Sequence, residues 1–165
     1  MKMNREKLPF RKNCEGYFLD RDNKILARKT EFGVIVFPGG GVDEGENVEG
    51  AMIRETLEET GAVINNLKFL GNLKFVWGEN WAQTKKQKER FKQFQGEDMY
   101  FFTGKIIGFK KSYLTEEDAW HKNKFMEIKE VIESIKSQLN NKSVANYRKA
   151  QFKFLNQIFT DVKNL

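Results

Sequence analysis

A cluster of charged residues between positions 46 and 59 is the part of this chain best suited to chemistry. It contains Glu46, Arg54, Glu55, Glu58 and Glu59. On a helix the last three would share one face within a turn, where like charges repel each other and the helix dipole disfavours negative charge. A bound cation would offset both costs, and carboxylate oxygens suit Mg²⁺ or Mn²⁺. We therefore predict a metal site here rather than a solvated acidic face.

The helix that would carry these side chains has start and stop signals. Asn47 suits the N-cap, Glu49 the first turn and Gly61 the end, which predicts a helix over residues 48–60. Its opposite arc is mostly apolar and would pack on a sheet. The residues of that arc are Val48, Met52, Ile53, Thr56 and Leu57.

Three consecutive glycines precede the helix. The apolar run 34–37 leads into Pro38 and then Gly39, Gly40 and Gly41, which predicts a buried strand followed by a flexible loop. Glycine lets the backbone approach a ligand closely, so amides and carbonyls of this loop can line a metal and phosphate site.

The spacing from Gly40 to Ala62 resembles the signature of the Nudix hydrolases. After Gly40 come five residues, Glu46, seven residues, Arg54-Glu55, two residues, Glu58-Glu59, one residue and Gly61. Thr56 and Ala62 stand where the signature has aliphatic residues, and the charged positions are unaffected. The resemblance implies an α/β protein, a Nudix-type α/β/α sandwich with a mixed β-sheet.

The resemblance also implies an enzyme and roles for its residues. It implies a Mg²⁺-dependent hydrolase, with Mn²⁺ as the alternative cofactor, that cleaves a diphosphate linkage in a small nucleotide. Glu58, Glu59 and the carbonyl of Gly39 would ligate the metal, while Glu55 would be either a ligand or the general base. Arg54 would pair with a carboxylate of the cluster and orient it.

Further site residues are proposed outside this core. Gly39, Gly40 and Gly41 are expected to bind substrate. Arg28 resembles an arginine that contacts substrate phosphates in some family members, and an ordinary surface arginine is the equal alternative. Many members recruit another acidic residue from outside the signature. The candidates here are Glu97, Asp98, Glu116, Glu117 and Asp118, and the sequence does not choose among them.

Size and composition fit one enzyme domain over residues 1–165, with net charge +6. Residues 1–11 are expected to form a flexible basic N-terminus, and residues 78–96 a basic insertion between strands. No apolar stretch is long enough to cross a bilayer and no secretory signal is visible, so we expect a cytoplasmic protein without a membrane partner. Cys14, the single cysteine, is interpreted as a small buried residue, and His121, the single histidine, as a surface residue.

The remaining apolar patterns predict strands at 13–20, 24–29, 67–77 and 99–109, and helices at 125–139 and 144–159. Together with the strand at 34–37 and the helix at 48–60 they give a mixed sheet with helices on its faces.

The substrate is not fixed by the signature. Only Pro9 and Pro38 are present, so the downstream prolines typical of ADP-ribose and NADH pyrophosphatases are missing. Hydrolysis of a nucleoside triphosphate, ordinary or modified, to the monophosphate and pyrophosphate is the interpretation that remains. One alternative is an RNA 5′-end or cap pyrophosphohydrolase, because the insertion mixes Trp81, Phe91 and Phe94 with five basic residues between Lys85 and Lys92. The other is a non-catalytic nucleotide-binding regulator. The sequence leaves the oligomeric state open.

Overall fold

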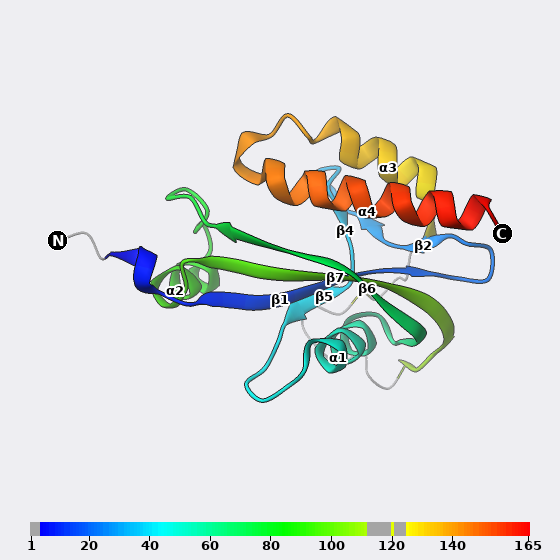
Figure 1. Cartoon of the computed structure of the whole chain (residues 1–165), viewed down its shortest axis with the longest axis horizontal. Helices are drawn as coiled ribbons and strands as arrows, with labels where there is room; N and C mark the ends of the chain where they lie inside the picture. Colours follow the sequence, from blue (N-terminus) through cyan, green and yellow to red (C-terminus); the bar gives the residue numbers. More distant parts are fainter. Residues whose placement is uncertain (1–3, 112–119, 121–124) are drawn as a thin grey trace.

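The computed structural model describes residues 4–111, 120 and 125–165. A six-stranded mixed sheet forms the middle layer, with helix α1 (Val48–Thr60) on one face and helices α3 (Ile128–Ser137) and α4 (Ala145–Lys163) on the other (Figure 1). This arrangement confirms the predicted α/β sandwich and its mixed sheet. Among the described residues, no helix has the length and apolar character needed to cross a membrane.

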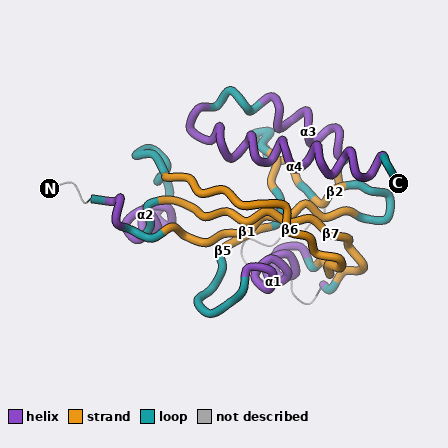
Figure 2. Tube along the Cα trace, viewed as in Figure 1, coloured by secondary structure: helices purple, strands orange, loops and turns teal. Residues whose placement is uncertain are grey.

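Three long strands dominate the sheet: β1 (Phe10–Leu19), β6 (Ala62–Val76) and β7 (Gly96–Phe109). With β2 (Ile25–Leu26) and β8 (Phe125–Met126), the strand order is β6-β7-β1-β2-β8, and β5 (Gly39–Gly41) pairs with β1 outside this path. β1 and β7 are parallel, whereas β6 is antiparallel to β7. The long strands continue beyond the helical layers toward α2 (Lys85–Gln93), as Figure 2 shows.

The expected strand at 24–29 is wrong as a single element. It divides into β2 (Ile25–Leu26), which joins the central sheet, and β3 (Arg28–Lys29), which pairs with β4 (Ile35–Val36) in a separate two-stranded sheet. Ile25, Leu26 and Ala27 are all fully buried, so the alternation that one half-exposed strand would show is absent. The predicted helix at 125–139 likewise begins with a short strand, β8 (Phe125–Met126), which pairs with β2.

The glycine segment is a strand rather than a flexible loop. Gly39, Gly40 and Gly41 pair antiparallel with Glu15, Cys14 and Asn13 of β1. A Cβ atom on Gly39 would lie 2.3 Å from the carbonyl oxygen of Cys14, so the close approach of the two backbones requires glycine there.

Helix α1 has the predicted bounds. The side chain of Asn47 accepts a hydrogen bond from the Gly50 amide at 2.6 Å, and Gly61 ends the helix with a left-handed φ of 74°. Thr56, which replaces an aliphatic residue of the signature, is fully buried and donates its hydroxyl hydrogen to the Met52 carbonyl at 2.7 Å. The substitution is therefore accommodated within the helix.

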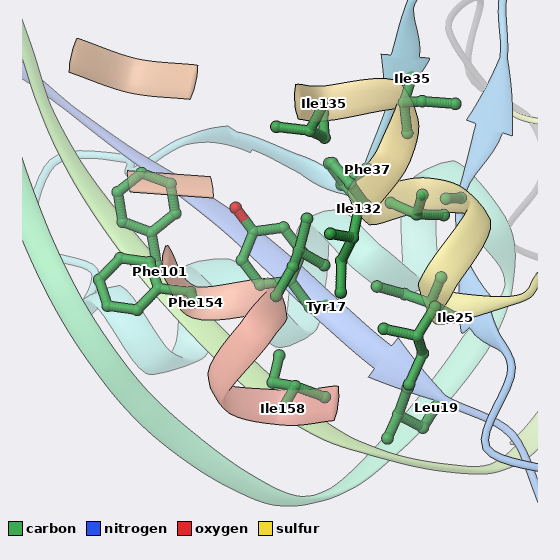
Figure 3. Close-up of a cluster of buried hydrophobic side chains, with 14 of the residues drawn as sticks. Tyr17, Leu19, Ile25, Ile35, Phe37, Phe101, Ile132, Ile135, Phe154 and Ile158 are labelled. Carbon is green, nitrogen blue, oxygen red and sulfur yellow. The ribbon is translucent and has the colours of Figure 1, made fainter. Parts of the chain in front are cut away.

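Hydrophobic side chains pack on both faces of the sheet, because successive residues of a strand point to opposite sides. Tyr17 and Phe101 contact the α3 and α4 layer, where Phe154 and Ile158 complete the cluster drawn in Figure 3. Phe18 and Phe102 pack on the other face with Met52 and other residues of the α1 layer.

The insertion at 78–96 contains helix α2, which the sequence pattern does not predict. Thr84 caps it, and Gln87 closes a capping box. Part of the N-terminal segment expected to be flexible is bound to this insertion. Arg5, in the 3₁₀ helix η1 (Arg5–Lys7), donates hydrogen bonds of 3.0–3.3 Å to the carbonyls of Trp77, Phe91, Phe94 and Gln95. A second 3₁₀ helix, η3 (Lys142–Val144), precedes α4.

Candidate active site

Arg54 connects the acidic residues of α1 to the segment before the helix. Its Nε and Nη2 atoms donate to the two oxygens of Glu46 at 2.8 and 3.0 Å. Its Nη1 atom donates to Glu55 and to Glu58, each at 3.0 Å, and Nη2 also donates to the carbonyl of Gly41 at 3.0 Å. The expected pairing of Arg54 with the cluster is present, and it involves three carboxylates.

The charges in this network stabilise one another. Hydrogen bonding from Arg54 holds the pKa of Glu46 below its ordinary value, and the Asp43 amide adds a bond of 3.0 Å. Glu46 first, and then Glu55, raise the pKa of Arg54, while burial opposes the shift. Glu46 is thus an ionised partner that fixes the guanidinium, which in turn orients Glu55 and Glu58.

The acidic cluster supplies oxygen donors of the kind that Mg²⁺ prefers. Glu55 and Glu58 are partly exposed, at 16% and 27%, and meet on the same nitrogen of Arg54. Across the described residues, however, no three His, Cys, Asp or Glu side chains are gathered closely enough to hold a metal ion. The side chains of the predicted ligand set are therefore not gathered at one point. The donor chemistry fits the metal.

Strand β5 lies directly against this cluster. A Cβ atom on Gly40 would be 2.3 Å from the carboxylate carbon of Glu55, so only a glycine leaves room for that side chain in this position. On Gly41 a Cβ atom would instead lie 2.4 Å from Nη2 of Arg11. The side chains of Glu55 and Arg11 thus pack directly against the backbone of the glycine strand.

A pocket of about 710 Å³ also adjoins β5. Its lining includes Gly39 and Gly40, so the pocket and the acidic cluster meet at the glycine strand. Trp77 and Trp81 stack in its lining with ring centroids 3.7 Å apart and planes 3° apart. The other lining aromatic residues are Phe37, Phe75 and Tyr147, and its buried or partly buried polar residues are Asn13, Glu15 and Glu97. An aromatic pocket with few polar groups is typical of a small-molecule site.

Two of the candidate acids outside the signature, Glu97 and Asp98, are neighbours on β7. Glu97 lines the pocket and its Oε1 atom accepts hydrogen bonds from Asn13 at 3.0 Å and Arg11 at 3.4 Å. Burial raises the pKa of Glu97, and the bond from Asn13 and the charge of Arg11 oppose that shift. Asp98 is buried and accepts hydrogen bonds from Asn72 at 2.9 Å and Tyr100 at 3.1 Å. Glu116, Glu117, Asp118 and His121 lie outside the described residues.

A family model described as the NUDIX domain matches residues 16–147. The chain belongs to the NUDIX hydrolase family. This result confirms the resemblance based on the spacing from Gly40 to Ala62 and the enzyme class that it implies.

Comparisons with individual NUDIX proteins agree on the fold. A NUDIX hydrolase from Nitrosomonas europaea superposes with a TM-score of 0.57 at 15% identity, covering 87% of this chain and 88% of that chain. A MutT protein from Bacillus halodurans has a TM-score of 0.51 at 22% identity, covering 75% and 72%. The ADP-ribose pyrophosphatase of Methanocaldococcus jannaschii is 42% identical over 57 residues, which is 32% of this chain and 34% of the relative. The match thus spans about a third of that relative's length.

Arg28, the predicted phosphate contact of this NUDIX chain, lies in β3 with its guanidinium carbon 5.3 Å from the ring centroid of Trp120. Its Nε is buried and has no hydrogen-bond acceptor among the described residues. Cys14 is buried under the NUDIX helix and donates its thiol hydrogen to the Gly40 carbonyl at 3.4 Å. Burial raises its pKa to about 12, as expected for a packing residue.

The sequence did not predict several residues that line the pocket of this NUDIX domain. Glu15 is buried and accepts hydrogen bonds from Tyr17 and Gln151, each at 2.7 Å, and from Tyr147. Its position could have been inferred from strand alternation, which places Asn13, Glu15 and Tyr17 on one face of β1. No sequence signal connects Tyr147 or Gln151 to Glu15, because α4 follows it by more than a hundred residues.

Proposed function

We propose that the protein is a Mg²⁺-dependent hydrolase that converts a nucleoside triphosphate to the monophosphate and pyrophosphate. The observation that carries this proposal is the contact of β5 with both the acidic cluster and the aromatic pocket. A nucleotide has one anionic and one aromatic half. The phosphates would lie beside α1 and the base would lie in the pocket, with the glycine strand between them.

Glu58, Glu59 and the carbonyl of Gly39 would hold Mg²⁺. When bound, the metal would neutralise phosphate oxygens and lower the pKa of a water molecule. Glu55, whose carboxylate lies against Gly40, would accept a proton as that water attacks phosphorus and the bridging P–O bond breaks. Arg54 would keep the carboxylates oriented, and Arg28, whose side chain is partly exposed, would contact a phosphate oxygen through its guanidinium group. The products are a nucleoside monophosphate and pyrophosphate.

The geometry favours a small nucleotide over RNA. Phe91, one of the aromatic residues expected to stack on RNA bases, has the guanidinium carbon of Arg5 3.3 Å from its ring centroid. Lys92 is paired with Glu89 at 3.2 Å. Lys85 and Lys88, which are exposed on α2, would attract an anionic substrate by long-range electrostatics.

Phosphate and pyrophosphate release with Mg²⁺ tests this proposal. The panel should contain ordinary and oxidised nucleoside triphosphates, ADP-ribose, dinucleotides and capped RNA. Glu59→Gln should abolish turnover without a large change in Tm, while Glu130→Gln, the same chemical change at an exposed position of α3, should leave it intact. Turnover that persists in Glu59→Gln, or turnover of capped RNA alone, would overturn the proposal.

A further inference from the structure

The carboxylates that line the pocket beside β5 differ in how many hydrogen bonds they accept from the protein. Glu97 is the partly buried carboxylate, with 13% of the side chain exposed. Both hydrogen bonds to it, from Asn13 and Arg11, end on Oε1. The charge of Arg90 also acts on Glu97. Because the bonds from Asn13 and Arg11 both end on Oε1, Oε2 is the oxygen of Glu97 that a ligand in the pocket would use.

Glu15, another of the three carboxylates that line the pocket, cannot serve in the same way. Glu15 is 6% exposed, and both of its oxygens already accept hydrogen bonds, from Tyr17, Gln151 and Tyr147. Its acceptor capacity is largely used inside the protein. Glu79, the third carboxylate in the lining, is exposed, where water competes for its oxygens. Among the partly or fully buried carboxylates of the pocket, Glu97 is therefore the one suited to recognise the edge of a ligand.

The tryptophan pair gives the pocket a flat aromatic surface, and one of its indole N–H groups has no acceptor among the described residues. Trp81 is partly exposed and stacks on Trp77, which is only 2% exposed. The Nε1 atom of Trp77 is buried without an acceptor among the described residues. Buried indole N–H groups normally have a partner. Nucleobases stack on aromatic side chains whatever their sequence identity, at about 1–3 kcal/mol per base.

We propose that this pocket selects nucleotides whose base carries an exocyclic amino group, and that Glu97 is the specificity-determining residue. This rests on the proposed function, because it takes the pocket to be the base subsite of the nucleotide. An ionised carboxylate only accepts hydrogen bonds, so it matches an amino group. The edge of uracil or thymine presents two carbonyl oxygens around a single N–H, and these oxygens repel the carboxylate. Cytosine differs from uracil chiefly by the amino group that replaces one of these oxygens, so the two form a matched pair.

Binding without metal separates this inference from the hydrolytic proposal. Titration of CMP and UMP in EDTA, followed by intrinsic tryptophan fluorescence, should show CMP binding about tenfold more tightly, since a good base-edge contact is worth roughly 1–3 kcal/mol. Glu97→Gln replaces the two carboxylate acceptors with one amide donor and one acceptor. It should reduce the difference in affinity between CMP and UMP to within about threefold. Trp81→Ala should weaken both ligands and leave the ratio unchanged, because stacking does not read the base edge.

Glu130→Gln is the matched surface control, and Tm measurements should show that all variants fold. Equal affinity of the wild-type protein for CMP and UMP would overturn the inference without requiring any variant. So would a ratio that is unchanged in Glu97→Gln. Discrimination between CMP and UMP in a protein that hydrolyses no nucleotide would support the base subsite while the hydrolytic proposal fails.

Discussion

Gly40 of β5 and Glu55 of α1 are in direct contact: a Cβ atom on Gly40 would lie 2.3 Å from Cδ and 2.5 and 2.6 Å from the two carboxylate oxygens of Glu55. Glycine at this position is therefore part of what fixes the position of the carboxylate. The requirement comes from the space that Glu55 occupies, and not from an unusual backbone dihedral angle at Gly40.

Gly40→Ala is expected to reduce hydrolysis strongly and to change stability little. The new methyl group would push the end of the flexible Glu55 side chain away from β5, and a displacement of about 1 Å at a reacting group can cost on the order of 100-fold in rate. Steady-state kinetics with Mg²⁺ and a thermal melt would measure the two effects.

Gly108→Ala is the matched control, because a Cβ atom at Gly108 would have no neighbour within 4 Å. It should keep wild-type kinetics. Equal activity of the two alanine variants would show that the Gly40 contact does not control the position of Glu55.

Arg54→Lys is expected to lower activity or Mg²⁺ affinity by about 10- to 100-fold, the usual effect of losing a residue that orients metal ligands. Lysine keeps the positive charge but cannot bond Glu46 through two parallel N–H groups while also bonding Glu55 and Glu58. Mg²⁺ titrations of the turnover rate would give both quantities. Arg21→Lys, on the exposed turn after β1, is the control, and identical titrations for the two variants would contradict the role of Arg54.

Arg5→Lys is expected to loosen the insertion that carries Trp81. The guanidinium of Arg5 bonds four backbone carbonyls at the base of this insertion, and a lysine cannot reproduce that fork. Loss of one hydrogen bond to a charged group costs roughly 1.5–3 kcal/mol, so amide hydrogen exchange over residues 77–95 should accelerate by about tenfold or more. Exchange in the centre of β7 should be unchanged, and an unaltered rate over 77–95 would show that Arg5 does not hold the insertion.

The part of the fold that the sequence predicts best is helix α1, because its cap residues and apolar arc are local signals. The division of residues 24–29 between two sheets could not be predicted from local pattern, since it depends on which strands Ile25 and Arg28 meet. The pairing of Gly39–Gly41 with β1 has the same cause. Glycine is poor in strand propensity, and here the demand for close backbone approach outweighs that preference.

The site shows the same division between local and long-range information. The spacing of Arg54, Glu55 and Glu58 within one helix predicts their proximity, and the structure contains it. The pairing of Glu97 with Asn13 joins two parallel strands 84 positions apart. A sequence pattern could suggest Glu97 as an acid near the site, but its place in the aromatic pocket depends on strand register.

The buried carboxylate of Glu15 should make stability depend on pH in a defined direction. Burial raises its pKa above the ordinary value of 4.5, while hydrogen bonds from Gln151, Tyr147 and Tyr17 oppose the shift. For an acid with a raised folded-state pKa, the folded protein binds the proton more tightly than the unfolded chain. The contribution of Glu15 to the free energy of unfolding is therefore most favourable below pH 4.5 and falls as pH rises from there through its folded-state pKa.

Glu15→Gln removes this titration and keeps the size of the side chain. The free energy of unfolding of the wild-type protein, minus that of Glu15→Gln, should become steadily smaller as pH rises above 4.5. Urea unfolding at a series of pH values measures the difference, with Glu130→Gln as the same change on an exposed helix surface. A difference that is flat with pH, or that grows as pH rises, would mean that the three donors outweigh burial and keep Glu15 ionised in the folded protein.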